Sequence, residues 1–405
     1  MPSIISATTT SGLVNTADNS GDLQFQTQNG ANTITLPNSS GTLATTANLA
    51  GLGFKNRIIN GGMTIDQRNA GASITNSGTN NQFPVDRFGI WGQVASKYTA
   101  QQNAGSVTPP AGFTNYLGIT SSSAFTPLGV NDLYMVAQQI EGFNTADLNW
   151  GTANAKTVTL SFWVRSSGLT YPATFGGSLQ NSAVDRSYPF NYTISTANTW
   201  EQKSITVAGD TSGTWIGATN GIGIRVWFAL GVGTNYSGTA GAWVGADYRS
   251  STGATNVLGT NGATLYITGV QLEVGSTATS FDYRPYGTEF SLCERYFQKY
   301  SGNTTGNPSD GGFVAAPIFQ ATESYTGLTF PQMRTGPSFS YSSLSHFTIL
   351  SDGVARSPLT NLVSNGSSNN KIEIYLTWSS NLTAGFSAWL RINTPSGFYS
   401  LSAEL

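Results

Sequence analysis

The feature that most constrains the fold of this chain is the spacing of its apolar residues, which alternate with polar residues in short runs. Residues 158–164 are an example, because alternation places Val158, Leu160 and Phe162 on one face of a strand and Trp163 on the opposite face. Helical periodicity is almost absent along the chain. The pattern predicts antiparallel strands joined by tight turns, and therefore an all-β fold.

Strand signals of this kind recur at irregular spacing, and Asn-Gly or Asp-Gly pairs separate many of them. The runs cover residues 133–140, 158–164, 204–207, 222–230, 265–272, 313–319, 347–350, 371–378 and 386–392. The turn candidates are Asn29-Gly30, Asn60-Gly61, Asn220-Gly221, Asn261-Gly262, Asp310-Gly311, Asp352-Gly353 and Asn365-Gly366. Many strands without intervening helices predict an antiparallel β-sandwich, with a jelly roll favoured over a closed barrel.

The first 53 residues differ from the rest of the chain. They contain two short strand signals, at residues 23–25 and 33–36, and a weak repeat of Ser-Gly followed by leucine at residues 20–23 and 40–43. They contain too few large apolar residues to bury a core of their own. We interpret residues 1–53 as an N-terminal attachment or shaft segment that is either disordered or ordered by neighbouring copies or by another protein, and we favour strands ordered by contacts between subunits.

Two further parts are predicted after this segment. Residues 54–287 form the jelly-roll domain, and residues 288–405 form a smaller C-terminal β-domain. A short helix opens the second of these, because Ser291 and Glu294 have the spacing of a capping box and Gly302 follows shortly after.

The composition narrows the partners that the chain can have. Charged residues make up 9% of it, and 18 basic and 20 acidic residues give a net charge of −2. A surface of hydroxyls and amides depends little on salt, which suits a part exposed outside cells. The charge balance argues against nucleic acid as a partner. No apolar run is long enough to span a bilayer and the first residues lack signal-peptide features, so we expect no membrane insertion and synthesis in a cytoplasm.

Residues that carry catalysis or bind metals are scarce. The single cysteine, Cys293, excludes an intramolecular disulfide framework, and the single histidine, His346, lacks a nucleophile elbow and zinc-ligand partners. Paired carboxylates could hydrolyse a glycosidic bond, but the candidates lie far apart in the sequence. They are Asp210, Asp247, Glu273 and Asp282. We therefore predict no catalytic residue, no enzyme activity and no cofactor, and the sequence leaves open one structural calcium ion with unassigned ligands.

Several charged residues are interpreted as structural. Asp210 lies in a Gly-Asp-Thr-Ser-Gly sequence, where its side chain would cap its own backbone turn. Asp86, Arg87 and Arg284 could form a buried ion pair in so uncharged a chain, but pairing at the surface is the ordinary explanation and we assign them structural roles.

Four aromatic residues are candidates for sugar binding. Aromatic rings stack on the apolar faces of sugars while neighbouring amides and carboxylates fix the hydroxyl groups. The loops that contain Trp215, Tyr236, Trp243 and Tyr248 have this composition. We predict these four as glycan-binding residues, and the alternative for each is a place in the core or in a subunit interface.

Four stretches resemble the tail-fibre and tail-tip receptor-binding proteins of bacterial viruses, in the order that this family shows. They are residues 56–68 (NRIINGGMTIDQR) with 85–88 (VDRF), residues 156–165 (KTVTLSFWVR) with 199–201 and 209–215, residues 267–275 (ITGVQLEVG) with 281–286 (FDYRPY), and residues 292–297 (LCERYF). Residues 199–200 and 266–272 are also similar in pattern to carbohydrate-binding jelly-roll modules. The last hundred residues vary widely among similar proteins.

The resemblance implies a protein of the virion tail, made in the host cytoplasm, that mediates host attachment. Its expected partners are two further copies of itself in a homotrimer, other tail proteins at the N-terminal segment, and a glycan of the host-cell surface. A purely structural virion protein without glycan binding and a polysaccharide depolymerase are alternatives. A secreted bacterial sugar-binding module is another, but the missing leader and residues 56–68 weigh against it.

Overall fold

The computed structural model describes residues 23–26, 33–36, 55–79, 81–302, 312–351, 354–356, 359–379 and 382–405. The chain divides into two compact units, residues 1–53 and 54–405. In the first unit, β1 (Leu23–Gln26) pairs antiparallel with β2 (Thr33–Leu36). Both strands lie where the alternation predicts them. The repeat at residues 20–22 and 40–43, and the turn candidates at 29–30, 310–311 and 352–353, lie outside the described residues.

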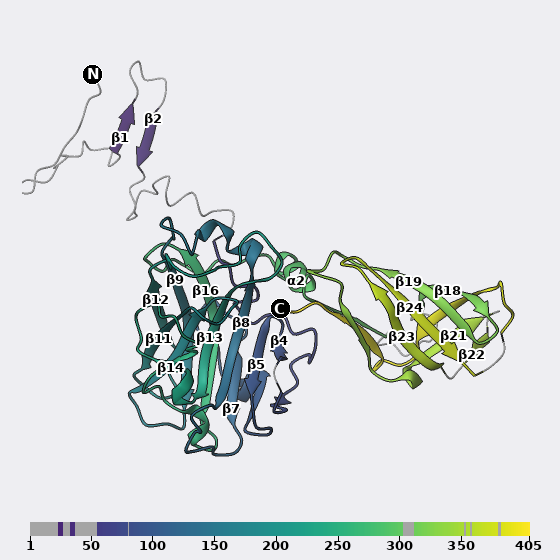
Figure 1. Cartoon of the computed structure of the whole chain (residues 1–405), viewed down its shortest axis with the longest axis horizontal. Coiled ribbons are helices and arrows are strands. Elements are labelled where there is room, and N and C mark those ends of the chain that lie inside the picture. Colours follow the sequence, from purple (N-terminus) through teal and green to yellow (C-terminus); the bar gives the residue numbers. More distant parts are fainter. Residues whose placement is uncertain are drawn as a thin grey trace, which may run out of the picture. The chain divides into compact units, whose positions relative to one another are not determined.

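The first part of the second unit is a sandwich of two antiparallel sheets (Figure 1). The first sheet has the order β11 (Ser187–Ile194), β10 (Ala173–Gln180), β13 (Ile222–Val232), β8 (Leu133–Glu141), β5 (Phe88–Gly92), β4 (Gln82–Val85). The second has the order β12 (Glu201–Val207), β9 (Val158–Ser167), β16 (Thr264–Val274), β7 (Leu117–Ser121), β6 (Tyr98–Gln102), β3 (Ile74–Thr75). The predicted all-β sandwich class is confirmed.

The core of the sandwich lies between the two sheets and follows the alternation of the sequence. In β9, Val158, Leu160 and Phe162 are fully buried, whereas Trp163 on the opposite face is half-buried. The Phe162 ring packs edge-on against Phe228 of β13, 5.1 Å away between ring centroids. Burial of the alternate apolar side chains fixes the strand register, because a slip by one residue would turn them all outward.

The predicted helix exists, but its start was placed wrongly. Helix α2 spans Tyr286–Glu294 and begins after Pro285, so Ser291 lies inside it and does not cap it. Proline suits a helix start because its missing N–H has no partner there in any case. The helix ends before Tyr296, which is fully buried where the sandwich meets the following domain.

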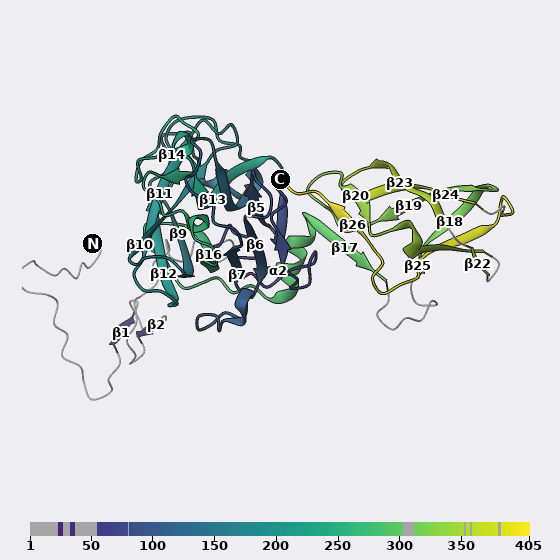
Figure 2. The same cartoon turned by 90° about the horizontal axis from the view of Figure 1, so that it is seen from below.

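The C-terminal part is a smaller β-domain with two sheets (Figure 2). One contains β17 (Phe297–Ser301), β26 (Phe398–Ser402) and β20 (Ser338–Tyr341), in that order. The other has the order β22 (Val354–Arg356), β21 (Phe347–Ser351), β25 (Ser387–Ile392), β18 (Gly312–Gln320), β19 (Glu323–Thr329), β24 (Lys371–Trp378), β23 (Leu359–Ser367).

The seven-stranded sheet curls around its own core. Strand β21 contacts β23 although four strands separate them in the sheet order. The inner face buries Phe347, Ile374 and Leu390 together with Leu401 of the smaller sheet. Asn365-Gly366, predicted as a turn, is instead a bulge inside β23, where the register shifts between Ser364 and Gly366. An Asn-Gly pair supports a bulge as readily as a hairpin turn.

Asp86 and Arg87, which were expected at the surface, are buried where the C-terminal domain joins the sandwich. Asp86 and Arg87 are 1% and 2% exposed and are not paired at the surface. Arg87 binds Glu404 and lies over the Tyr296 ring, and Arg68 bonds both Glu404 (3.0 Å) and Asp86 (3.4 Å). Burial raises the pKa of Asp86 to about 6, against the opposing charge of Arg68.

A second ion pair holds the same junction. The buried carboxylate of Glu141, at the end of β8, accepts two hydrogen bonds from Arg295 (2.8 and 2.6 Å) and one from the Tyr296 hydroxyl (2.7 Å). Burial by itself would raise the pKa of Glu141, but the hydrogen bonds outweigh it and hold the pKa below its usual value. The C-terminal domain is therefore attached to the sandwich by bidentate, partly dry contacts.

Candidate functional site

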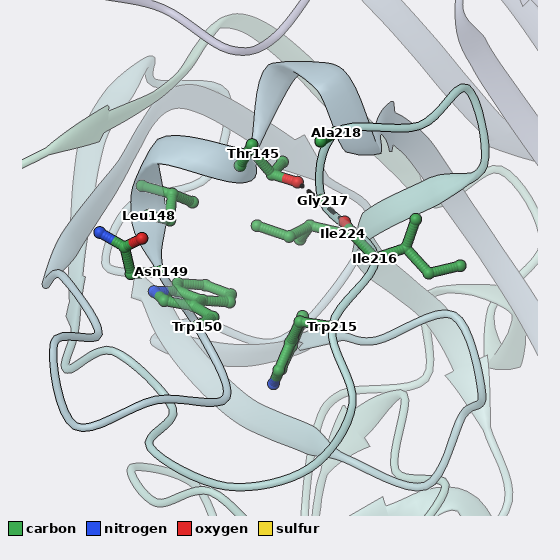
Figure 3. A pocket seen from close by; sticks show the side chains of 10 residues that line it. Thr145, Leu148, Asn149, Trp150, Trp215, Ile216, Gly217, Ala218 and Ile224 are labelled. Atoms are coloured by element: carbon green, nitrogen blue, oxygen red, sulfur yellow. Dashed lines mark hydrogen bonds between the residues drawn. The ribbon is translucent and has the colours of Figure 1, made fainter.

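A cavity of about 230 Å³ opens between two loops of the sandwich (Figure 3). One loop follows β8 and contains the short 3₁₀ turns Gly142–Asn144 and Ala146–Leu148. The other loop precedes β13 and contains Trp215 and Ile216. Backbone hydrogen bonds join the loops, from Phe143 N to the Thr219 carbonyl and from Gly142 N to the Gly221 carbonyl, both 2.8 Å.

The loops approach closely because Gly142 has no side chain. A Cβ atom at Gly142 would lie 3.0 Å from the carbonyl oxygens of Ile216 and Thr219. On the same side of the cavity the Thr145 hydroxyl bonds the Ile216 carbonyl at 3.3 Å, the contact that is dashed in Figure 3. Backbone contacts therefore fix the two loops that border the cavity.

Two tryptophan rings form one wall of the cavity. The rings of Trp150 and Trp215 lie 4.7 Å apart between centroids at an angle of 80°, and Figure 3 shows them next to each other. Trp243 stands edge-on to both, at 5.3 and 5.2 Å, but does not line the cavity. Leu148 and Ile224 complete the apolar lining. Edge-to-face contacts of this kind are favourable and hold each ring at a fixed angle.

All three indole N–H groups have acceptors inside the protein. Trp150 donates to the Lys156 carbonyl (2.8 Å), and Trp243 donates to the Ala208 carbonyl (2.7 Å). Trp215 donates to the Ser212 carbonyl (3.1 Å) and lies 3.3 Å from the Asp210 carboxylate. What the two lining indoles offer to a bound molecule is therefore ring surface.

Asp210 stabilises the backbone around the two tryptophans that form the wall of the cavity. Its carboxylate is 2% exposed and receives two hydrogen bonds from the Arg186 guanidinium (2.8 and 2.7 Å), which raise the pKa of Arg186. It also accepts the Ser212 N–H (3.1 Å), as the turn prediction requires, and its backbone carbonyl accepts the N–H of Gly151 (2.7 Å). One residue thus fixes the backbone next to both lining tryptophans.

The polar group at the cavity that remains accessible is the amide of Asn149. Asn149 is exposed and lines the cavity, and its side-chain amide makes a long hydrogen bond, 3.4 Å to the Asp147 carbonyl. Its backbone is left-handed, with φ of 53°, a conformation that asparagine adopts more easily than most residues. The arrangement can hold a molecule with one apolar face against the indoles and hydrogen-bonding groups at its edge.

The structure divides the four residues predicted for glycan binding into two pairs. Trp215 lines the cavity, and Trp243 supports it from the side. Tyr236 and Tyr248 share with Trp243 the loop between β13 and β16, where β14 (Ser237–Gly238) pairs with β15 (Ser250–Ser251), but neither tyrosine lines the cavity. The assignment of all four residues to glycan binding stays a prediction.

Tyr236 and Tyr248 belong to a network that anchors this loop. Arg249 lies over the rings of Tyr236 and Trp227, 5.4 and 5.3 Å from their centroids. It pairs with Asp247 at 2.9 Å, and Asp247 accepts a bond from the buried Gln180. The Tyr248 ring packs on Gly238, where a Cβ atom would come within 2.2 Å of it.

Sequence reasoning missed Trp150 and Asn149. They lie in the Asn-Trp-Gly sequence at residues 149–151, in a polar stretch between two strand signals. An aromatic residue in such a stretch is the same signal that selected Trp215. Trp150 and Trp215 are 65 positions apart in the sequence, so no local pattern predicts their contact.

The remaining candidates for chemistry have structural partners. The His346 Nδ1 atom lies 2.8 Å from the Ser342 hydroxyl, whose oxygen also accepts the Phe398 N–H. Glu273 is buried and accepts bonds from Gln271 and Thr279. Within the described part of the chain, no group of three or more histidine, cysteine, aspartate or glutamate side chains could hold a metal ion, and no helix has the length and apolarity to cross a membrane.

No protein-family model and no curated protein matches the chain. Among solved structures, it is similar to a CBM4 module, with 17% identity and a TM-score of 0.28 over 53% of this chain and 98% of the module. It is similar to the enzymatically active domain of tailspike protein 4 of bacteriophage CBA120 (12%, 0.28), covering 54% of this chain and 21% of that one. A third is TmCBM61 in complex with β-1,4-galactotriose (11%, 0.27; 55% and 99%). These identities and TM-scores are too low to carry an argument about ligand or activity.

Residues of the stretches that resemble tail proteins mostly support the junction and the sandwich. Asn56 bonds the Val270 carbonyl (3.1 Å) and accepts the Leu272 N–H (3.0 Å). Arg284 bonds the Ile58 carbonyl (3.1 Å) and Glu289. These contacts hold the fold together. The stretch that includes residues 209–215 is different, because it supplies Trp215 to the cavity.

Proposed function

We propose that this protein is a non-enzymatic adhesin of a virus tail that binds a host-surface glycan, and that the cavity at Trp150 and Trp215 holds one sugar residue of it. The observation that carries the proposal is the wall of two tryptophan rings whose N–H groups are already bonded. Such a wall suits the C–H face of a pyranose ring.

The size and polarity of the cavity support a single sugar residue. About 230 Å³ is below the range of about 300–1,000 Å³ that is typical of sites for drug-sized ligands. A purely apolar ligand would leave the Asn149 amide without a new partner, whereas a sugar hydroxyl would give it one. The lining residues include no carboxylate and no histidine, which fits binding without bond cleavage.

The role in host attachment rests on other support. The resemblance of residues 56–68 and 292–297 to tail proteins and the scarcity of charge suit a virion part that works outside cells, and on the same resemblance we propose a homotrimer. The proposed location is the tail, with the N-terminal segment toward other tail proteins. The depolymerase and purely structural alternatives predict different results in the experiment that follows.

The test uses the full chain and intact bacteria. Binding is measured before and after removal of surface polysaccharide, and the supernatant is assayed for released reducing ends. Free monosaccharides are then titrated while tryptophan fluorescence is recorded, because two indoles line the cavity. We expect binding that is lost on stripping, no released sugar, and a fluorescence change with one of the monosaccharides.

Two variants locate the site. Trp215→Ala removes the more exposed ring and should weaken sugar binding at least tenfold, about 1.4 kcal/mol. Trp163→Ala is the matched control, because Trp163 is also half-buried but lies on the outer face of β9 and does not line the cavity. Equal loss in both variants, or none in either, would contradict the proposed site. Released oligosaccharide would favour a depolymerase, and absence of any binding a structural protein.

A further inference from the structure

The outer face of the curled sheet in the C-terminal domain carries an unusual number of exposed apolar side chains. Phe319, Phe386, Trp389, Tyr325 and Val363 are 66%, 54%, 51%, 40% and 40% exposed. The opposite face of the same sheet packs the domain core, so these residues are not needed there. Apolar patches of this size on a folded chain usually mark an interaction surface.

Strand register places part of this patch in one row across three neighbouring strands. Tyr325 of β19 lies directly opposite Tyr375 of β24, and Tyr375 lies opposite Val363 of β23. The two tyrosine rings are 4.8 Å apart between centroids, and Phe319 is 6.1 Å from Tyr325. We call Phe319, Tyr325 and Tyr375 the aromatic row.

Hydroxyl, amide and carboxylate groups accompany the aromatic row. The Tyr375 hydroxyl donates to Glu323 (2.7 Å), and the Asn365 amide donates to Glu373 (2.6 Å). The hydroxyls of Thr360 and Thr377 lie 2.7 Å apart. Each of these groups keeps free hydrogen-bonding capacity at the surface.

The shape of the face argues against a second copy of the chain as its occupant. The sheet curls until β21 meets β23, so its outer face is convex, and two convex faces touch along a narrow line. A thin chain that follows the curvature fits this surface better.

We propose that the aromatic row is a second carbohydrate-binding surface, which takes an extended, uncharged stretch of polysaccharide running across strands β18, β19 and β24. Neighbouring strands are about 4.8 Å apart, which is close to the length of one hexose along an extended chain. The rings of Tyr325 and Tyr375, 34° apart in plane, can therefore stack on neighbouring sugars, while Phe319, at 86° to Tyr325, contacts the chain from the side. The carboxylates of Glu323 and Glu373 beside the row disfavour an acidic polymer. The proposal deepens the proposed function and rests on it, but it concerns different residues and a polymer in place of a single sugar.

The experiment is affinity electrophoresis of the full chain in gels that contain a soluble neutral glucan, galactan or mannan, or polysaccharide stripped from bacteria that the protein binds. The variant is Phe319→Ser with Tyr325→Ser. The matched control is Tyr286→Ser, because Tyr286 is 67% exposed but lies in α2, outside both the cavity lining and the curled sheet. Both positions are exposed, so we expect unchanged thermal unfolding. Monosaccharide titration by tryptophan fluorescence and sedimentation velocity are recorded for each.

We expect the double variant to lose affinity for at least one polymer about a hundredfold, roughly tenfold for each ring, while monosaccharide binding at the cavity is unchanged. Unchanged polymer affinity in the double variant overturns the proposal. If no polymer retards the wild-type chain, the proposal is also overturned. If the wild-type chain is an oligomer that dissociates in the double variant, the face belongs to a contact with a second copy and the proposal fails as well. Loss of monosaccharide binding in Trp215→Ala alone tests the cavity separately.

Discussion

Replacing Asp210 with alanine removes the partner of a mostly buried arginine. Asp210 is 2% exposed and Arg186 keeps a side-chain exposure of 19%, with two bonds of 2.8 and 2.7 Å between them. Removing one partner of a fully buried pair costs about 3–5 kcal/mol, because the other charge stays behind without compensation. The partial exposure of Arg186 lets water replace part of the loss. We expect the sandwich to be destabilised by about 2–3 kcal/mol.

Thermal unfolding followed by tryptophan fluorescence measures this loss. A transition of about 150–250 residues shifts by about 2–4 °C for each kcal/mol, so the Tm of the sandwich should fall by about 4–12 °C. Because the chain has two cores, the sandwich transition must be separated from that of the C-terminal domain. Sugar affinity should fall as well, because Trp215 loses one of its supports.

The control for this prediction is Asp185→Ala. Asp185 also carries one negative charge close to Arg186 in the sequence, but it is exposed and accepts one bond, from the Asn181 amide, which keeps the Thr214 carbonyl as a partner. Its loss should cost about 1 kcal/mol, less than the loss of Asp210. If the two variants unfolded at the same temperature, the ion pair would not support the wall of the cavity as described.

Three further predictions concern the junction and the backbone. Glu141→Gln should lower the unfolding temperature at neutral pH. The pKa of Glu141 in the folded chain lies below its ordinary value of 4.5, so its carboxylate stabilises the fold fully above pH 4.5. The difference in stability between wild type and variant should vanish as the pH falls through the lower folded pKa. The pKa of Asp86 is raised from 3.8 to about 6, so between these pH values Asp86 binds more protons in the folded than in the unfolded chain. The free energy of unfolding should therefore rise as the pH falls from about 6 to about 4. Asp86→Asn should abolish this pH dependence, measured in unfolding curves. Gly61→Ala should prevent folding, measured by circular dichroism, because its Cβ would lie 2.1 Å from a carbonyl oxygen of β16, whereas Gly287→Ala in α2, with open space around it, should stabilise by about 0.5–1 kcal/mol.

Features that depend on neighbouring residues were predictable from the sequence. The strands follow from alternation, as the burial of Val158, Leu160 and Phe162 shows. Features that depend on distant contacts were not. Arg87 looks like a surface charge until Glu404 pairs with it from the far end of the sequence, and Glu404 also pairs with Arg68, the partner of Asp86. For the same reason Trp215 was selected without its partner Trp150, since no local pattern links the two loops that the cavity joins.

The chain enters and leaves the C-terminal domain at neighbouring positions, which affects how the domain could be exchanged for another by recombination. Strands β17 and β26 are neighbours with Phe297 opposite Ser402, and the Ala403 N–H bonds the Tyr296 carbonyl at 2.8 Å. The whole domain therefore projects from two adjacent points, separated by about one strand spacing. A foreign domain with adjacent ends could be grafted between residues 296 and 403 if it replaced the contacts of Arg334 with Asn220 and of Lys299 with Arg68. Recombination at these two points would exchange the whole outer face of the curled sheet in a single step.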